Sequence, residues 1–435
     1  MRTRAEEQAM GVVEEGRLTV DPDMEARAAQ RTLHTLSLVL ALSWLGTNLG
    51  YAIAGLPFRF LLKEQLRLSP PEISAFLALG IFTNYIKPFA GILTDSVPLC
   101  GTRRRHYLLF GLIGCGLGWL LLSVVPLRYG VLLATYMAMY ATVVLISTTL
   151  GGVMVEVGIR FRAAGRLTAQ RVGMFKLAAL AGGPIGGYLA SKPFLLTAAI
   201  VAGLHFLLVP LIYSTLREPA TARVNREAWQ DAREKLRGLL QNRPLQMAAL
   251  MICLIAAAPG FGTPLLFHQT DTLGFQKQFI GNLELVHAAF GLMAAALYQR
   301  FCTHLTLKAL LSYSILVHAF GTLFYLAYTS REAAVAITAL EGIAQTFAML
   351  PVYDLAARAT PKGSEALGYS VMMSVWNLTN SFSDWTGSLL YAAFGLTFYH
   401  LVWVNAGTTL LAIVAVPFLP AALLSQRDRL PVRAA

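Results

Sequence analysis

Charged residues are scarce in this sequence. Asp, Glu, Lys and Arg make up only 13% of its 435 residues, whereas a soluble domain carries about 25%. Hydrophobic residues account for 56%. A soluble globule could not bury so much apolar surface, so the composition excludes a soluble enzyme, a disordered chain and a secreted disulfide scaffold. It predicts a polytopic membrane protein.

Cysteine is also rare, and no two cysteines form a C-x-x-C pair, so neither a disulfide framework nor a zinc site is expected. The chain has no H-E-x-x-H, no G-x-S-x-G and no Gly-rich nucleotide-binding loop, which argues against an intramembrane enzyme and an ATP-driven pump. We therefore expect no enzymatic activity, no cofactor and no bound metal. The four cysteines are Cys100, Cys115, Cys253 and Cys302.

Basic residues outnumber acidic ones, and the net charge is +12. The basic residues occur in short clusters between apolar runs, which is the pattern of membrane loops rather than of a nucleic-acid surface, so no nucleic acid is expected as a partner. The N-terminal segment is polar and mixed in charge. It has no apolar core, so we expect a cytoplasmic tail and no cleavable signal peptide.

Apolar runs of about 20 residues, the length that crosses a bilayer, predict twelve transmembrane helices. The longest polar break divides them six and six, so the expected fold is all-α with two six-helix bundles. The predicted organisation is a cytoplasmic tail (1–33), an N-terminal bundle (34–216), a linker (217–243), a C-terminal bundle (244–425) and a second tail (426–435).

Lys and Arg concentrate in every second loop, which predicts that these loops and both termini are cytoplasmic. One outer loop departs from the rule, because it contains Arg59, Lys63 and Arg67. An even number of helices agrees with two termini on the same side.

The linker is expected to form an amphipathic helix on the cytoplasmic surface, with Asn225 as its N-cap. The alternative is a flexible linker in which the apolar period is incidental. The residues of the expected apolar face are Trp229, Ala232, Leu236 and Leu240.

The two halves repeat weakly at a spacing near 200 residues. Lys87-x3-Gly91 corresponds to His287-x3-Gly291, Glu156-x3-Arg160 to Asp354-x3-Arg358, and Gly187 to Gly387. Three matches in equivalent helices favour two related halves, the arrangement of transporters that work by rocking one bundle against the other.

The second predicted helix ends in a motif that resembles the loop between helices 2 and 3 of the major facilitator superfamily. Gly91 is expected to allow a close helix approach, and Asp95 to accept hydrogen bonds from arginines of the following loop. Such a latch would hold the cytoplasmic side shut. The alternative is a turn whose basic residues only set orientation. The arginines are Arg103, Arg104 and Arg105.

Two segments carry a narrower resemblance, to the folate–biopterin transporter family. Residues 87–107 read Lys-Pro-x2-Gly-x3-Asp-Ser-x-Pro-x2-Gly-x-Arg-Arg-Arg-x-Tyr, and residues 361–366 resemble that family's Pro-x-Gly-Ser-Glu-Gly, with Ala366 at the last position. Ser374-x-x-Asn377 follows in the next helix. The resemblance implies a major facilitator fold and a folate or pterin substrate.

Glu156 and Asp354 fall at cytoplasmic helix ends, and each precedes an arginine by four residues, Arg160 and Arg358. They are predicted to form a second layer of the latch, in which they bond to the loop with Arg103–Arg105 or to the loop with Arg160–Arg166. The alternative is an ordinary surface pair on each helix, worth a few tenths of a kcal/mol.

Ionisable and polar residues inside the predicted helices are the best site candidates, because a charge within the bilayer needs a partner or a wet cavity. A planar bicyclic anion would need lysines for its carboxylates, amides for its ring edges and an aromatic for stacking. The predicted substrate residues are Lys87, Lys176, Asn48, Asn84, Trp376, Asn377 and Gln345. The predicted proton carriers are Glu284, His287, Glu341 and Asp384, although Asp384 could instead lie at the outer mouth.

We therefore expect a monomeric, proton-coupled secondary transporter of a small organic anion in a bacterial inner membrane, in contact with lipid. A segment around Gly183 and Pro184 partly resembles a motif of drug–proton antiporters, so drug export is one alternative. The other is a non-transporting assembly factor on the same scaffold.

Overall fold

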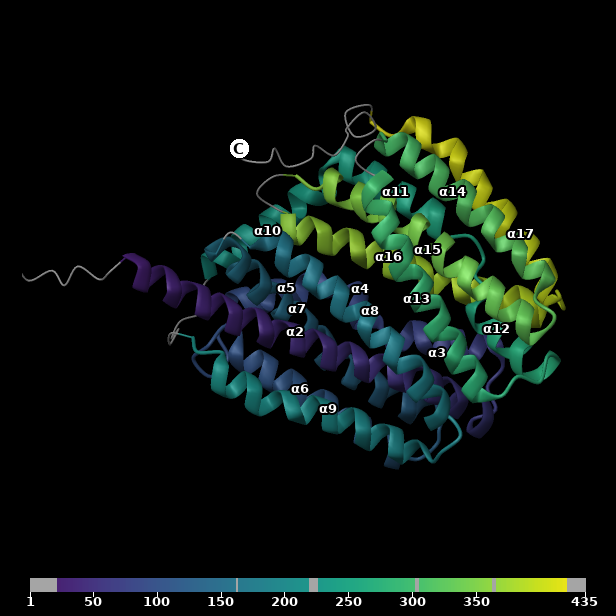
Figure 1. Ribbon diagram of the computed structural model, residues 1–435, viewed down its shortest axis with the longest axis horizontal. Coiled ribbons are helices and arrows are strands. Elements are labelled where there is room, and N and C mark those ends of the chain that lie inside the picture. Colours follow the sequence, from purple (N-terminus) through teal and green to yellow (C-terminus); the bar gives the residue numbers. More distant parts are fainter. Residues whose placement is uncertain (1–21, 162, 219–225, 302–304, 362–364, 421–435) are drawn as a thin grey trace, which may run out of the picture.

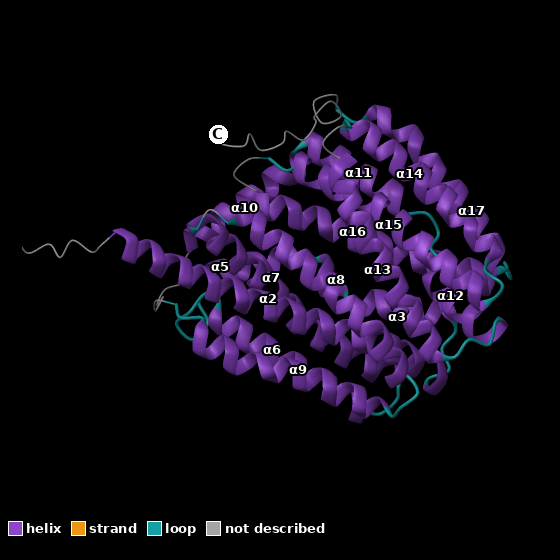
Figure 2. Cartoon of the chain, viewed as in Figure 1, coloured by secondary structure: helices purple, strands orange, loops and turns teal. Residues whose placement is uncertain are grey.

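The computed structural model describes residues 22–161, 163–218, 226–301, 305–361 and 365–420. Within these ranges the regular structure is helical and no strand occurs (Figure 2). Figure 1 shows the first half of the chain packed as one bundle beside the second half.

The N-terminal bundle contains six segments that cross the molecule. The second segment is broken twice, at Ile81 and Ile86, where the backbone leaves helical geometry. In order, the segments are α2 (Pro22–Phe60) with a π-helical turn η1 (Leu61–Gln65), α3 (Pro70–Gly80) to α4 (Phe82–Tyr85) and α5 (Lys87–Ser96), α6 (Arg105–Val124), α7 (Tyr129–Arg160), α8 (Ala164–Leu189) and α9 (Phe194–Thr215).

The C-terminal bundle repeats this plan, with its first segment broken between residues 257 and 261. In order, its segments are α11 (Arg243–Ala256) and α12 (Gly262–Phe267) with the π-helical turn η2 (His268–Thr272), α13 (Lys277–Phe301), α14 (Leu307–Leu323) with η3 (Phe324–Ala327), α15 (Arg331–Ala359), α16 (Glu365–Ala393), and α17 (Phe398–Leu411) with η4 (Ala412–Phe418). The predicted all-α fold of twelve transmembrane segments in two six-helix bundles is confirmed.

Eight of the described helices are long and apolar enough to cross a membrane on their own. The remaining described segments do not meet this criterion of length and apolar character. The second and seventh segments are broken, and α8 and α16 are more polar. These two polar helices face the other bundle: α8 packs on α13, and α16 packs on α3. The fifth segment of each half thus contacts the second segment of the other half.

Helix α10 (Arg226–Gln241) lies between the halves, contacts α5, α11 and α16, and meets α11 at a bend of 68°. Asn225 lies outside the described residues, as does the side chain of Trp229. The expected apolar face is wrong at its end: Leu240 is 58% exposed, whereas Leu239 is buried in the core of the C-terminal bundle. The bend into α11 brings Leu239 rather than Leu240 against that bundle.

The molecule has two ends that are used below as reference points. We call the end with α10 and residues 97–104 the linker end. The opposite end, with residues 61–69 and 268–276, is called the far end.

The two bundles touch most closely where glycines of α8 meet a glycine of α13. A Cβ added at Gly281 would lie 2.5 Å from the carbonyl oxygen of Gly183 and 2.6 Å from the Cα of Gly187. These neighbours are backbone atoms that cannot rotate away, so the crossing requires glycine.

We expect Gly281→Ala to lower the thermal stability of the purified protein in detergent by about 1–3 kcal/mol, because overpacking forces the two helices apart. Gly203→Ala is the matched control, since a Cβ at that helical glycine has no neighbour within 4 Å and should be neutral or mildly stabilising. Equal melting temperatures for the two variants would show that the close crossing is not required.

Candidate functional site

Lys87 stands at the first position of α5, directly after the break at Ile86. The break fits Pro88, which has no backbone N–H for the carbonyl of Asn84 four residues earlier and whose ring clashes with the preceding turn. Lys87 is partly buried and lies at the positive end of the helix dipole, which favours an anion at this point.

A second cation lies beside Lys87. Arg171 on α8 interacts electrostatically with Lys87, and its guanidinium carbon lies 4.5 Å from the centroid of the Trp44 ring of α2. Neither Lys87 nor Arg171 takes part in any ion pair found within the described ranges of the chain. Two partly buried cations of one bundle therefore lie together without a carboxylate between them.

Aromatic side chains of the other bundle complete this cluster. Tyr353 of α15 and Tyr369 of α16 both interact electrostatically with Arg171. The ring of Tyr353 meets Trp376 edge to face, with centroids 6.1 Å apart. Lys87 and Trp376, two predicted substrate residues, therefore belong to one cluster that spans the interface between the bundles.

A second polar cluster surrounds Lys176, one helical turn further along α8. A Cβ at Gly291 of α13 would lie 3.4 Å from the Nζ of Lys176 and 3.0 Å from the Oγ1 of Thr346. His287 interacts electrostatically with both Lys176 and Glu284 and lies beside Gln345. Four predicted residues from both bundles are thus brought together here.

The contacts of the predicted asparagines differ from those of Gln345. Asn48 donates a hydrogen bond of 2.6 Å to the carbonyl of Trp44 within its own helix. At Asn84 the backbone carbonyl, and not the amide, accepts a hydrogen bond from Ser374 of α16, at 3.5 Å. Asn377 follows Trp376 on α16 and is partly buried.

Glu341 of α15 is a carboxylate inside the C-terminal bundle. Its Oε2 is buried and has no hydrogen-bond partner among the described residues, and it interacts electrostatically with Tyr325 of η3. A buried carboxyl without a partner is most stable in its neutral form.

Asp384 of α16 has a different environment from the other predicted proton carriers. It accepts hydrogen bonds from the backbone nitrogen of Thr263 at 2.9 Å and from the hydroxyl of Thr263 at 2.6 Å. These donors lie at the start of α12, just after the break in the seventh segment. Asp384 therefore stabilises a broken helix by occupying one of its free N-terminal donors.

At the linker end, two of the predicted latch residues form an ion pair. Glu156 pairs with Arg104, at 2.8 Å from its Nη2, and not with Arg160, which instead lies over the Phe161 ring. The backbone nitrogen of Arg104 donates to Glu218, at 2.9 Å. Of the two arginine loops predicted as partners of Glu156, the one before α6 supplies the contact.

The other latch residues give a mixed outcome. Asp354 and Arg358 pair within their own helix, at 2.7 Å, as the alternative to a latch layer describes. The expectation for Gly91 is wrong, because a Cβ there would make only an ordinary contact of 3.6 Å with Thr148. Arg105 donates to the Tyr213 carbonyl at 2.8 Å, and Arg103 is exposed. The side chain of Asp95 lies outside the described residues.

Several residues of these clusters were not predicted. Arg171 was missed because Arg160, Arg162 and Arg166 precede it and suggest a loop, whereas it lies well inside α8. Gly152 was also missed: a Cβ there would lie 2.6 Å from the Arg104 guanidinium. In the sequence, the signal for the position of the Arg104 side chain was this glycine, four residues before Glu156.

The environment of Asp384 predicts how its variants behave. Asp384→Asn keeps an acceptor for the Thr263 nitrogen, so transport and its pH dependence should be unchanged. Asp384→Ala leaves buried donors unsatisfied and should lower stability by about 1–3 kcal/mol, measured as thermal unfolding in detergent. Thr263→Val is the matched partner variant, and loss of proton dependence in Asp384→Asn would contradict the structural role.

Comparison with known proteins agrees with this geometry. Curated relatives include the folate-biopterin transporter of Synechocystis sp., 29% identical over 397 residues that cover 84% of this chain and 78% of the relative. Folate transporter 1 of Plasmodium falciparum is 22% identical, covering 79% of this chain and 70% of its own length.

Solved structures share the fold at low sequence identity. The D-xylose–proton symporter superposes with a TM-score of 0.65 at 16% identity, covering 88% of this chain and 98% of its own. A mutant of the nucleoside transporter NupG gives 0.64 at 16% identity, with 88% and 99% covered. The profile of the BT1 family matches residues 49–430, which is most of the sequence. The chain is a multi-pass membrane protein of the BT1 family of transporters, with the fold of the major facilitator superfamily.

Proposed function

We propose that this protein transports a folate- or pterin-like organic anion by alternating access, with Lys87 and Arg171 as the anion-binding groups. The observation that carries the proposal is the cluster of these two cations with aromatic residues of both bundles. The names of the relatives from Synechocystis and Plasmodium support the choice of substrate.

The chemistry of the cluster suits a substrate with a flat ring and carboxylates. An arginine and a lysine without carboxylate partners bind carboxylates strongly in a partly dry site, and the guanidinium adds a bidentate geometry. Trp44, Tyr353 and Trp376 offer ring faces or edges for a planar heterocycle. A cationic drug would be repelled by Lys87 and Arg171, which disfavours drug–proton antiport.

The position of the cluster supports alternating access. Lys87 and Arg171 belong to the N-terminal bundle, whereas Tyr353, Tyr369 and Trp376 belong to the C-terminal bundle. A substrate held between the two sets touches both bundles, so rocking one against the other changes which side can reach it. A non-transporting assembly factor would not require such a divided site.

We also propose that protons drive the transport and that Glu341 is one carrier. Its buried oxygen lacks a hydrogen-bond partner in the described chain, so a proton stabilises it in this conformation. Glu284 and His287 are the second candidate, because they lie beside Lys176 of the opposite bundle. Movement of Lys176 relative to them would change the affinity of the pair for a proton.

The remaining assignments follow from the charge pattern. We propose that the linker end is cytoplasmic, because the basic loops gather there. The far end would then face outward, in a bacterial inner membrane. The protein is proposed to act as a monomer, since the divided site is complete within one chain.

We expect Lys87→Gln and Arg171→Gln each to reduce the uptake of labelled folate into proteoliposomes by about tenfold or more, because each removes a charge-assisted contact worth about 1.5–3 kcal/mol. Arg128→Gln, which removes a cation from a far-end loop, is the control and should transport normally. Unchanged uptake in both site variants would contradict the anion site.

Glu341→Gln separates proton coupling from substrate movement. If Glu341 carries the proton, the variant should lose accumulation driven by an imposed pH gradient and keep exchange of labelled for unlabelled substrate, since exchange needs no net proton movement. The two assays are run on the same proteoliposomes. Accumulation equal to that of the unmodified protein would exclude Glu341 as the carrier.

A further inference from the structure

Two ion pairs join the bundles at the far end. Lys63 of η1 contacts Asp271 and Thr270 of η2, and Lys277 at the start of α13 contacts Glu64 of η1, at 2.5 Å. Lys277 also donates a hydrogen bond of 3.2 Å to the carbonyl of Ala190, which follows α8. Every one of these contacts links one bundle to the other.

The lysines are held by more than the carboxylates. The Nζ of Lys63 lies 4.2 Å from the ring centroid of Phe267, and that of Lys277 lies 4.5 Å from the ring centroid of Phe60. The side chains of Lys63 and Lys277 are only 12% and 24% exposed. A partly desolvated lysine over an aromatic ring interacts more strongly than a surface pair.

The two acceptor turns are copies of each other. Residues 55–67 and 262–274 share the pattern Gly-x-Pro-x2-Phe-x3-acid-x-Leu, and each ends in a residue with positive φ, Arg67 at 54° and Gly274 at 63°. The backbone hydrogen bonds are the same. Leu66 donates to the Leu61 carbonyl and Leu273 to that of His268, both across a π-helical turn. The duplicated turn thus places an acidic residue and an aromatic at the same position in each bundle.

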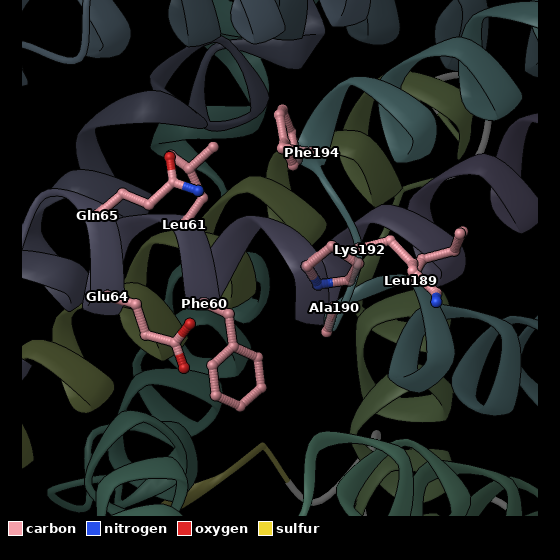
Figure 3. A pocket seen from close by; sticks show the side chains of 9 residues that line it. Phe60, Leu61, Glu64, Gln65, Leu189, Ala190, Lys192 and Phe194 are labelled. Carbon is pink, nitrogen blue, oxygen red and sulfur yellow. The ribbon is translucent and has the colours of Figure 1, made fainter.

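Beneath the ion pairs, the bundles share an apolar cluster. Phe60 and Ala190 of the N-terminal bundle are buried together with Leu266, Phe275 and Ile280 of the C-terminal bundle. Apolar side chains under a layer of ion pairs exclude water from the space between the bundles. Figure 3 shows Phe60 and Glu64 extending to the same side of the first turn, which places the apolar and the charged layer next to each other.

We propose that the Lys63–Asp271 and Lys277–Glu64 pairs form a gate that holds the far end closed and must break each time the substrate path opens there. The proposal rests on the proposed transport function for its role, and on the contacts above for its geometry. It also explains why Lys63 occurs in a loop of the side that otherwise carries few basic residues: its charge pairs with the other bundle.

The π-helical turns suit such a gate. A π-helical turn is wider than an α-helical one, and such turns are frequent at functional sites. Each is preceded by a proline. Pro57 lies inside α2, where it removes a backbone hydrogen bond and weakens the helix, and Pro264 lies in the first turn of the short helix α12, directly after the break in the seventh segment. The ends of α2 and α12 can therefore bend without unfolding the bundles.

The test measures the distance across the far end in the full-length protein, in lipid and without substrate. Spin labels at Leu127 and Thr329, on far-end loops of different bundles, are introduced in a background without the four native cysteines. Both positions are exposed and lie outside the gate. Removal of both donors, Lys63→Gln with Lys277→Gln, should increase the population with the longer distance about threefold to tenfold, as expected when a two-state equilibrium loses one or two ion pairs.

The matched control removes two other far-end cations, with Lys192→Gln and Arg331→Gln. Each also lies over an aromatic ring, Tyr188 or Phe279, but within its own bundle. The control should leave the distance distribution unchanged. Removal of the acceptors, Glu64→Gln with Asp271→Asn, should reproduce the effect of removing the donors.

A charge-exchange variant distinguishes the loss of an ion pair from misfolding. Lys63→Asp alone should open the far end, and Lys63→Asp combined with Asp271→Lys should restore the short distance. A distribution that does not change in the donor or acceptor variants, or that changes equally in the control, would overturn the gate. Because no substrate is present, this result is independent of whether folate is transported.

Discussion

A charge held among apolar helices and lipid is stable only with a partner, with water or in neutral form. This constraint sorts the charges of the protein into three kinds. Glu156 with Arg104 pairs within one bundle, and Lys63 with Asp271 pairs between bundles. Lys87 and Arg171 have no ion pair in the described chain and lie beside aromatics instead. The first kind stabilises a bundle, the second stabilises one arrangement of the two bundles, and the third is the anion site that we propose.

The interface between the bundles follows from the duplication of the chain. Packing α8 on α13 and α16 on α3 places the fifth segment of each half against the second segment of the other. The glycines at the α8–α13 crossing bring backbone to backbone, so this contact can act as a pivot. The ion pairs lie at one end of that pivot and the cation–aromatic cluster lies nearer the other.

Much of the fold could be predicted from the sequence, because apolar runs of bilayer length and clustered arginines depend only on local composition. The site could be predicted only in part. Lys87 and Trp376 could be selected because a polar or aromatic residue at depth is visible in sequence, and the structure brings them into one cluster. Arg171 was missed because its neighbours suggest a loop. For Glu156 the sequence left two arginine loops open as partners, and the far-end pairs were missed because they join residues more than 200 positions apart. The duplicated Gly-x-Pro-x2-Phe segments were the available signal for those pairs.

The positions of the charges along the interface mean that a bound substrate would affect how the two bundles move relative to each other. A ligand shifts an equilibrium only if it binds the two states differently. An anion bound by Lys87 and Arg171 contacts one bundle, and its ring contacts the other bundle only when Tyr353 and Trp376 are near. Binding therefore favours the arrangement in which the bundles are close at the site. Rocking away from that arrangement must open one end of the molecule. The far-end ion pairs determine how strongly the far end resists opening. In the proposed mechanism, the same pairing rule that stabilises the empty protein thus sets the energy that the substrate and the proposed protons supply.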